Sequence, residues 1–175
     1  MNELEKIEQA ERNFDRMIVA IDEQGSSADH VGFKDHLCAF LASARSVQQY
    51  ALEEAKQNSG GEMWYNNYVG HSNILKFFKI TRDFEIHLEP VSLNNDLTVK
   101  LGGAVRENVP CTSKATFWFA GNWYARQARD YRPADKKLCR SLIQSKDVMA
   151  LCQDYLNELK GFVADGIRQS FIAGQ

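Results

Sequence analysis

The segment that decides the fold is residues 62–88, EMWYNNYVGHSNILKFFKITRDFEIHL. Large side chains recur in it at intervals of three or four residues, at Trp64, Tyr68, His71, Leu75 and Phe78. This spacing predicts one amphipathic helix, which Pro90 ends because proline cannot continue the helical hydrogen-bond ladder. Additional aromatic and aliphatic residues beside this stripe indicate a helix that is buried on more than one side.

Three other segments show the same helical spacing of apolar residues. They are residues 2–24, residues from about 30 to 57, and residues 134–173, where Ser145-Lys146-Asp147 offers a second helix start. The Gly60-Gly61 connection is short, so the helices on either side of it should pack as neighbours. The sequence therefore predicts a mainly α fold, an antiparallel helical bundle.

The periodicity changes in residues 91–124. Leu97, Val99 and Leu101 alternate with polar neighbours, and residues 116–119 are rich in strand-forming types. We predict a small β-hairpin, inserted between helices at about residues 95–120, with a structured loop as the alternative reading of the same pattern.

Length and composition limit the class of protein. A chain of 175 residues fits one domain, residues 1–175, and its net charge of -2 gives no overall positive field for nucleic acid. The charged N-terminus has no signal-peptide core, and no apolar run approaches the roughly 20 residues of a spanning helix. We expect a soluble cytoplasmic protein with reduced cysteines and no membrane association.

Familiar cofactor and metal motifs are absent from the sequence, so we expect no cofactor and no metal site. His30 and His36 are six residues apart, which places them on different faces of a helix, and we expect both on the surface. Cys139 and Cys152 lie on an apolar helical face and are better explained as buried thiols than as nucleophiles.

Ionisable residues gather at the end of the segment 62–88, in Lys79-Ile80-Thr81-Arg82-Asp83-Phe84-Glu85-Ile86-His87. A helix C-terminus favours protonated histidine, and arginine offers a planar fork for phosphate. Arg82 and His87 together could cleave RNA without a metal, with the histidine moving a proton and the arginine stabilising charge. The alternative is a structural Asp83–His87 pair worth about 0.5 kcal/mol, which the residues alone favour.

In its context, the motif Arg82-x4-His87 resembles the HEPN (higher eukaryotes and prokaryotes nucleotide-binding) family, whose helical bundles carry R-x(4 to 6)-H, often with Asn or Asp after the Arg. Asp83 occupies that second position here. The flanking Phe77-Phe78-Lys79 and Leu88-Glu89-Pro90, and Ser43-Ala44-Arg45-Ser46-Val47, also look like bacterial members. The resemblance covers about residues 30–90 and, less closely, 147–163.

The resemblance implies a homodimer that brings two copies of Arg82 and His87 together in a metal-independent endoribonuclease. It implies Arg82, His87 and Asp83 as catalytic residues, with Lys79 and Arg45 binding the RNA substrate. It also implies a toxin–antitoxin or phage-defence setting, with a cognate antitoxin or a nucleotidyltransferase-type protein as partner. Two other readings stay open: a non-catalytic HEPN-like scaffold that binds RNA, nucleotide or protein, and a helical protein with an aromatic-lined ligand pocket.

Overall fold

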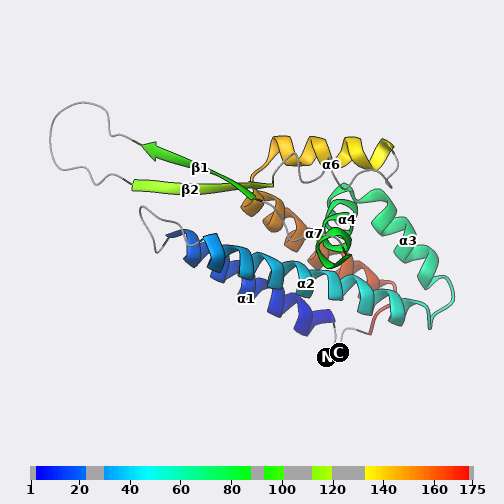
Figure 1. The fold of residues 1–175 in the computed structure, drawn as a ribbon. Coiled ribbons are helices and arrows are strands. Elements are labelled where there is room, and N and C mark those ends of the chain that lie inside the picture. Colours follow the sequence, from blue (N-terminus) through cyan, green and yellow to red (C-terminus); the bar gives the residue numbers. More distant parts are fainter. Residues whose placement is uncertain (1–2, 23–29, 88–92, 101–111, 120–132, 174–175) are drawn as a thin grey trace.

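The computed structural model describes residues 3–22, 30–87, 93–100, 112–119 and 133–173 (Figure 1). Within these ranges the backbone alone is described for residues 22, 30, 31, 81–87, 93–100, 112–119 and 135. The helices are α1 (Glu3–Asp22), α2 (His30–Ala55), α3 (Gly61–His71), α4 (Asn73–His87), α6 (Pro133–Ser145) and α7 (Val148–Arg168), and the strands are β1 (Leu93–Lys100) and β2 (Thr112–Phe119). The prediction of a mainly α helical bundle is confirmed for the described chain.

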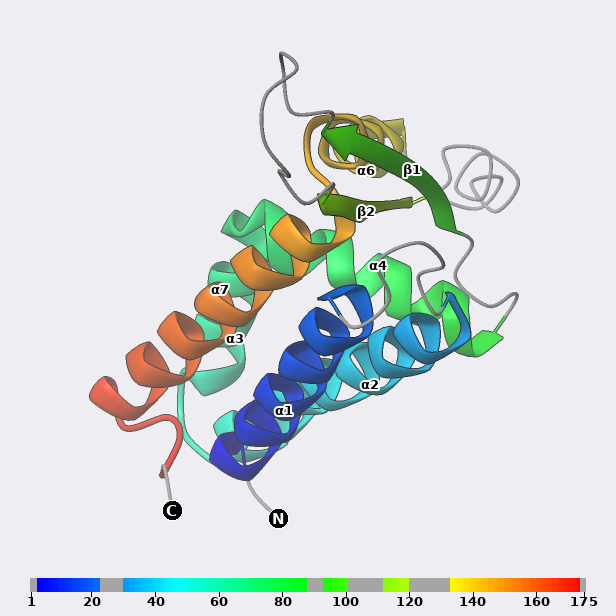
Figure 2. The same ribbon diagram turned by 90° about the vertical axis from the view of Figure 1, so that its left-hand side faces the viewer.

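Helices α1 and α2 form an antiparallel pair along one side of the bundle (Figures 1 and 2). Helix α7 packs against α1, α2 and α4, and α3 packs beside α2 as the short Gly60-Gly61 connection predicts. The core residues come from every helix of the bundle, and Phe33, Phe40, Phe77, Phe78 and Phe162 are among its largest fully buried side chains. Burial of apolar area on this scale is the main driving force for the fold.

Tyr155 of α7 lies at the centre of the core and is 1% exposed. Its ring stacks on Phe78 of α4, with 4.2 Å between ring centroids and 3° between planes, and meets the ring of Phe40 of α2 edge-on. The fully buried Gln48 of α2 donates a hydrogen bond from Nε2 to the Tyr155 hydroxyl at 3.2 Å. One side chain therefore joins α2, α4 and α7, and its polar atom is satisfied.

The prediction of one continuous helix from residue 62 to 88 is wrong, because the helix is interrupted at Ser72, between α3 and α4. Ser72 adopts an extended conformation, with φ -84° and ψ 111°, while its N–H donates to the Tyr68 carbonyl. Its hydroxyl accepts a hydrogen bond from the N–H of Leu75 at 3.3 Å. Ser72 thus caps α4, and a serine that bonds locally to the backbone competes with helix continuation.

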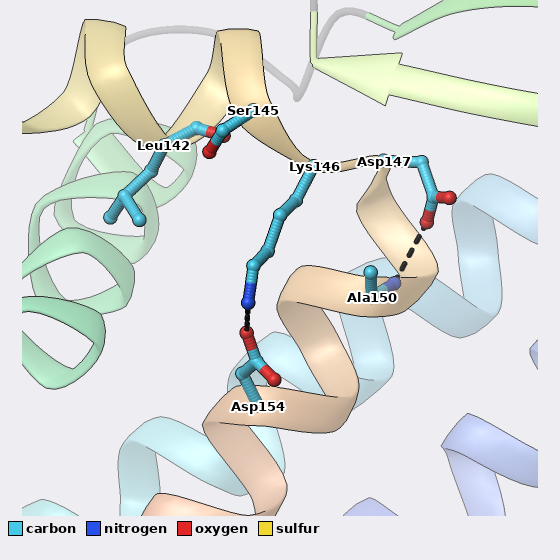
Figure 3. A network of polar contacts seen from close by, with 6 residues as sticks. All are labelled: Leu142, Ser145, Lys146, Asp147, Ala150 and Asp154. Atoms are coloured by element: carbon cyan, nitrogen blue, oxygen red, sulfur yellow. Dashed lines mark hydrogen bonds and ion pairs between the residues drawn. The ribbon is translucent and has the colours of Figure 1, made fainter.

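The helix start predicted at Ser145-Lys146-Asp147 is confirmed. The Asp147 carboxylate accepts a hydrogen bond from the Ala150 N–H at 2.8 Å and caps α7 (Figure 3). Lys146 forms an ion pair with Asp154, one turn further along α7. These local contacts end α6 and fix the direction in which α7 leaves it.

Two strands occupy the segment where the sequence predicts a hairpin. β1 and β2 pair antiparallel, with Leu93 opposite Phe119 and Lys100 opposite Thr112. The backbone of β2 comes close to α7 and to α1. A two-stranded hairpin is only marginally stable alone, so this proximity to helices supports the pairing of β1 and β2.

Both ends of the described chain meet the C-terminal end of α2. Glu54 accepts a hydrogen bond from the N–H of Ala173 at 2.8 Å, and Asn58 donates one to the Phe171 carbonyl at 3.3 Å. Glu3 is buried at the same place, and its pKa is raised chiefly by burial, with the nearby Glu54 carboxylate adding to the effect. Among the helices that the structure describes, none combines the length and apolar character needed to cross a membrane.

Two glycines within helices provide a matched test of this packing. A Cβ at Gly70 would meet nothing within 4 Å, whereas one at Gly166 would lie 2.5 Å from Ile172 Cδ1 and 2.7 Å from Trp64 Cη2. We expect Gly70→Ala to stabilise the protein by about 0.5–1 kcal/mol through helix propensity. Gly166→Ala should destabilise it by about 1–3 kcal/mol through overpacking. Urea unfolding measures both, and similar effects would contradict the close approach of Ile172 and Trp64 to α7.

Candidate functional site

Arg82, Asp83 and His87 lie on the last turns of α4, and their side chains fall outside the described atoms. The helix continues through His87, so all three belong to one helical segment. Positions five apart are rotated by about 140° around a helix axis, whereas positions four apart share a face. Asp83 and His87 therefore occupy one face of α4, and Arg82 lies at a position well around the helix from His87.

The N-terminal half of α4 is firmly packed. Leu75, Phe77 and Phe78 are fully buried, and the Phe77 and Phe78 rings meet edge-on at 5.0 Å. Lys79 follows directly and is exposed. Phe78, which stacks on Tyr155, lies one helical turn before Arg82, so the buried half of α4 fixes the path of the helix toward the motif.

Arg45, a predicted substrate-binding residue, is half-buried on α2. Its Nη1 donates a hydrogen bond to Gln48 Oε1 at 2.9 Å, and Gln48 in turn donates to the Tyr155 hydroxyl. Its Nε is buried and has no hydrogen-bond partner in the part of the chain that the structure describes. The structure therefore places Arg45 at the outer end of a polar chain that reaches Tyr155, a link that sequence spacing could not reveal.

A pocket of about 610 Å³ lies between α3, α7 and the residues after α7. Its lining combines aromatic, acidic and amide side chains: Gly60, Met63, Trp64, Asn67, Tyr68, His71, Ser72, Glu158, Asp165, Gln169 and Phe171. Ser72 is at the beginning of α4, about 15 Å of helix away from Arg82 at 1.5 Å per residue. The pocket is therefore separate from the predicted catalytic motif.

Trp64 forms the inner wall of this pocket. Its ring stacks on Phe162, with 5.0 Å between centroids and 9° between planes, and Phe171 approaches it at 5.6 Å. Its Nε1 donates a hydrogen bond to Asp165 Oδ2 at 2.7 Å. The chain turns back after α7 through Ser170, whose φ of 61° is in the left-handed region, and this reversal brings Phe171 toward Trp64.

Asp165 is held as a carboxylate by several donors. The hydrogen bond from Trp64 is the main cause that lowers the pKa of Asp165, and the Arg168 ion pair and a 2.7 Å hydrogen bond from Gln169 lower it further. Burial acts in the opposite direction but is outweighed. Asp165 therefore fixes the orientation of Trp64 as an ionised acceptor.

Tyr68 reaches from α3 across to α7. Its ring meets Phe162 edge-on at 5.2 Å, and its hydroxyl lies 3.4 Å from where a Cβ on Gly161 would be. The pKa of Tyr68 is raised by burial first and then by the negative charges of Glu158 and Asp165. The hydroxyl is thus in a region of negative potential at the pocket wall.

The sequence pattern identified the apolar face of α7 but not the acidic residues beside it. Glu158, Phe162, Asp165 and Gln169 are spaced by four, three and four residues, so they share one helix face. This spacing is visible in the sequence, but it indicates a pocket only when Trp64 and Tyr68 of α3 are known to lie opposite. An aromatic-lined ligand pocket was one of the alternative readings of the sequence. The structure adds polar residues to its lining that the sequence did not indicate.

Cys139 and Cys152 are buried as predicted, each 0% exposed. Burial raises the pKa of the Cys152 thiol well above its ordinary value, and the negative charge of Asp147 adds to the shift. The thiol form is therefore strongly favoured at neutral pH. Within the described ranges, no group of three or more His, Cys, Asp and Glu residues is arranged to hold a metal ion.

Comparison of the chain with protein-family models, with curated proteins and with solved structures finds no match.

The hydrogen bond between Trp64 and Asp165 leads to a pH-dependent prediction. Because the pKa of Asp165 is lowered in the folded state, its stabilisation is present above the unfolded pKa and is lost as pH falls through the folded one. We expect Asp165→Asn to lower the free energy of unfolding by about 1–3 kcal/mol at pH 7. The difference in free energy of unfolding between Asp165→Asn and wild type should become smaller below about pH 4.

The control is Asp154→Asn, on the same helix. Asp154 is 41% exposed and pairs with Lys146, so this variant should change stability by less than about 1 kcal/mol. Chemical denaturation at several pH values measures both variants. An equal loss at pH 3 and pH 7 for Asp165→Asn would contradict the ionised acceptor.

Proposed function

We propose that this protein is a metal-independent endoribonuclease of the HEPN type, in which Arg82 and His87 of α4 act on RNA. The observation that carries the proposal is the Arg82-x4-His87 motif, on a helix whose preceding turns are anchored in the core through Phe78 and Tyr155. Such anchoring suits a catalytic group, because small displacements of the reacting groups cost large factors in rate.

The proposed reaction uses the RNA's own 2′-hydroxyl as nucleophile. The 2′ oxygen attacks the adjacent phosphorus, the bond from phosphorus to the 5′ oxygen breaks, and the products are a 2′,3′-cyclic phosphate and a 5′-hydroxyl. One histidine accepts the proton of the 2′-hydroxyl, and another donates a proton to the leaving 5′ oxygen. Arg82 stabilises the negative charge that develops on the phosphate.

A homodimer follows from this proton balance. Each protomer supplies one His87 from the motif, so a base and an acid together need two copies. In addition, Arg82 and His87 are about 140° apart around α4, which suits a cleft shared by two helices better than one face of a single helix. In this arrangement, Asp83 shares the face of His87 and orients the imidazole.

Two further cations complete the proposed RNA site. Lys79 is exposed three positions before Arg82 and contacts the RNA backbone. Arg45 is the second substrate-binding candidate, and its hydrogen bond to Gln48 holds it at the surface of the core. A toxin or phage-defence role, with an antitoxin or a nucleotidyltransferase-type protein as partner, belongs to the same proposal. The non-catalytic HEPN-like scaffold is the competing outcome.

The direct test incubates purified protein with tRNA, a structured RNA and DNA of the same sequence, in the presence of a chelator. We expect RNA cleavage that leaves 2′,3′-cyclic phosphate ends, no effect of the chelator, and intact DNA, because DNA lacks the 2′-hydroxyl. His87→Ala and Arg82→Ala should each reduce the rate by at least about 100-fold. Their melting temperatures should stay close to wild type.

Matched controls are His71→Ala and Arg140→Ala, which remove an exposed residue of the same type outside α4 and should leave the rate unchanged. Sedimentation at micromolar concentration should show a dimer. Intact RNA with the wild-type protein, or undiminished cleavage by His87→Ala, would overturn the proposal. Intact RNA together with a lowered melting temperature in His87→Ala would instead support the scaffold with a structural Asp83–His87 pair.

A further inference from the structure

The pocket between α3 and α7 is built from two facing helix stripes. Two lining residues of α7, Glu158 and Asp165, and the C-cap residue Gln169 are spaced by seven and four residues. On the other side, Gly60 and positions 64, 67 and 71 of α3 are spaced by four, three and four. Each set of residues therefore lies on one helix face, and the two faces line an open pocket. The volume of about 610 Å³ is typical of a small-molecule site and is too large for a packing defect.

The charge of the pocket is negative. Among the described lining residues, the formally charged ones are Glu158 and Asp165, with neither lysine nor arginine beside them. Asp165 is already compensated by Arg168 and by the Trp64 N–H. Glu158 is different, because no hydrogen bond or ion pair joins it to another residue in the described part of the chain. Glu158 is thus the carboxylate available to a ligand.

The uncharged part of the lining includes aromatic rings and a flexible methionine side chain. Tyr68 and Phe171 are half-buried at the pocket wall, while Met63, another lining residue, is 68% exposed. An exposed methionine beside aromatic rings is suited to contact with an apolar ligand body, since methionine adapts to irregular shapes. A cation is attracted both by a carboxylate and by the face of an aromatic ring.

From this combination we infer that the pocket binds a small organic cation, an ammonium group carried on an apolar body. The ammonium lies between the Glu158 carboxylate and the Tyr68 ring, and the apolar body lies against Phe171 and Met63. Asp165 acts as a positioning residue that holds Trp64 as the rear wall. The inference does not depend on the ribonuclease proposal, because the pocket lies about 15 Å of helix away from Arg82.

The test uses three probes that share one apolar body and differ in charge: 4-phenylbutylamine, 4-phenylbutanol and 4-phenylbutyrate. Isothermal titration calorimetry on the full chain should show the amine binding about tenfold or more tightly than the alcohol, because a charge-assisted contact is worth about 1.5–3 kcal/mol. The acid should not bind. Equal affinities of amine and alcohol, or no binding by the amine, would overturn the inference.

Two variants assign the effect to the pocket. Glu158→Gln keeps the shape of the side chain and should weaken amine binding about tenfold while leaving alcohol binding unchanged. The matched control is Glu62→Gln, which removes an exposed carboxylate of α3 outside the lining and should leave amine binding as in wild type. Melting curves verify that both variants fold. Equal weakening by both variants would show a general charge effect and would contradict a specific site at Glu158.

Discussion

The buried side chain of Tyr155 is the contact on which the arrangement of the helices depends. Its ring stacks on Phe78 of α4 and meets Phe40 of α2, while its hydroxyl accepts a hydrogen bond from Gln48. A tyrosine in this place is apolar enough to fill the core and polar enough to require a partner there. These contacts thereby fix the positions of α2, α4 and α7 relative to one another.

The position of α4 follows from this contact. The stack between Phe78 and Tyr155 secures the buried half of the helix, and the Ser72 cap fixes where it begins. The last turns, which carry Arg82 and His87, continue from that anchored half. A helix that is packed firmly in the core along one half can hold polar side chains on its other half in fixed positions, which is a common arrangement in binding and catalytic sites.

The α3–α7 pocket rests on a second aromatic group, distinct from the first. Trp64 lies between Phe162 and Phe171, and the Asp165 carboxylate fixes the direction of its indole N–H. Ser170 allows the chain to reverse after α7 and to bring Phe171 into place. The molecule thus separates two features along its length: the motif at the end of α4, and the pocket at the beginning of that helix.

Apolar periodicity was sufficient to predict the helical segments, because burial of one face selects a helix. The short Gly60-Gly61 connection predicted that α2 and α3 are neighbours. Apolar periodicity failed at Ser72, where a single hydroxyl bonding to the backbone ends a helix in the middle of an apolar stripe. Apolar spacing also does not guarantee burial, since Leu4 and Ile18 of α1 are about 40% exposed.

The features missed by the sequence depend on partners far away in the chain. The hydrogen bond between Gln48 and Tyr155 spans 107 residues, and the one between Trp64 and Asp165 spans 101. A local pattern cannot indicate such a pair, because each residue alone fits an ordinary helical position. For the same reason, Arg45 could be identified as a cation but not as the end of a buried polar chain.

The central claim, that Tyr155 fixes α4 to the rest of the bundle, is tested most directly by amide hydrogen exchange of wild type and Tyr155→Leu. The substitution removes the ring stack and the Gln48 partner, and we expect exchange in residues 73–80 to become about 100-fold faster, with less change in α1. Met17→Ala, which truncates a fully buried side chain of α1, serves as the control and should accelerate exchange mainly in α1. Unchanged protection of residues 73–80 in Tyr155→Leu would contradict the account.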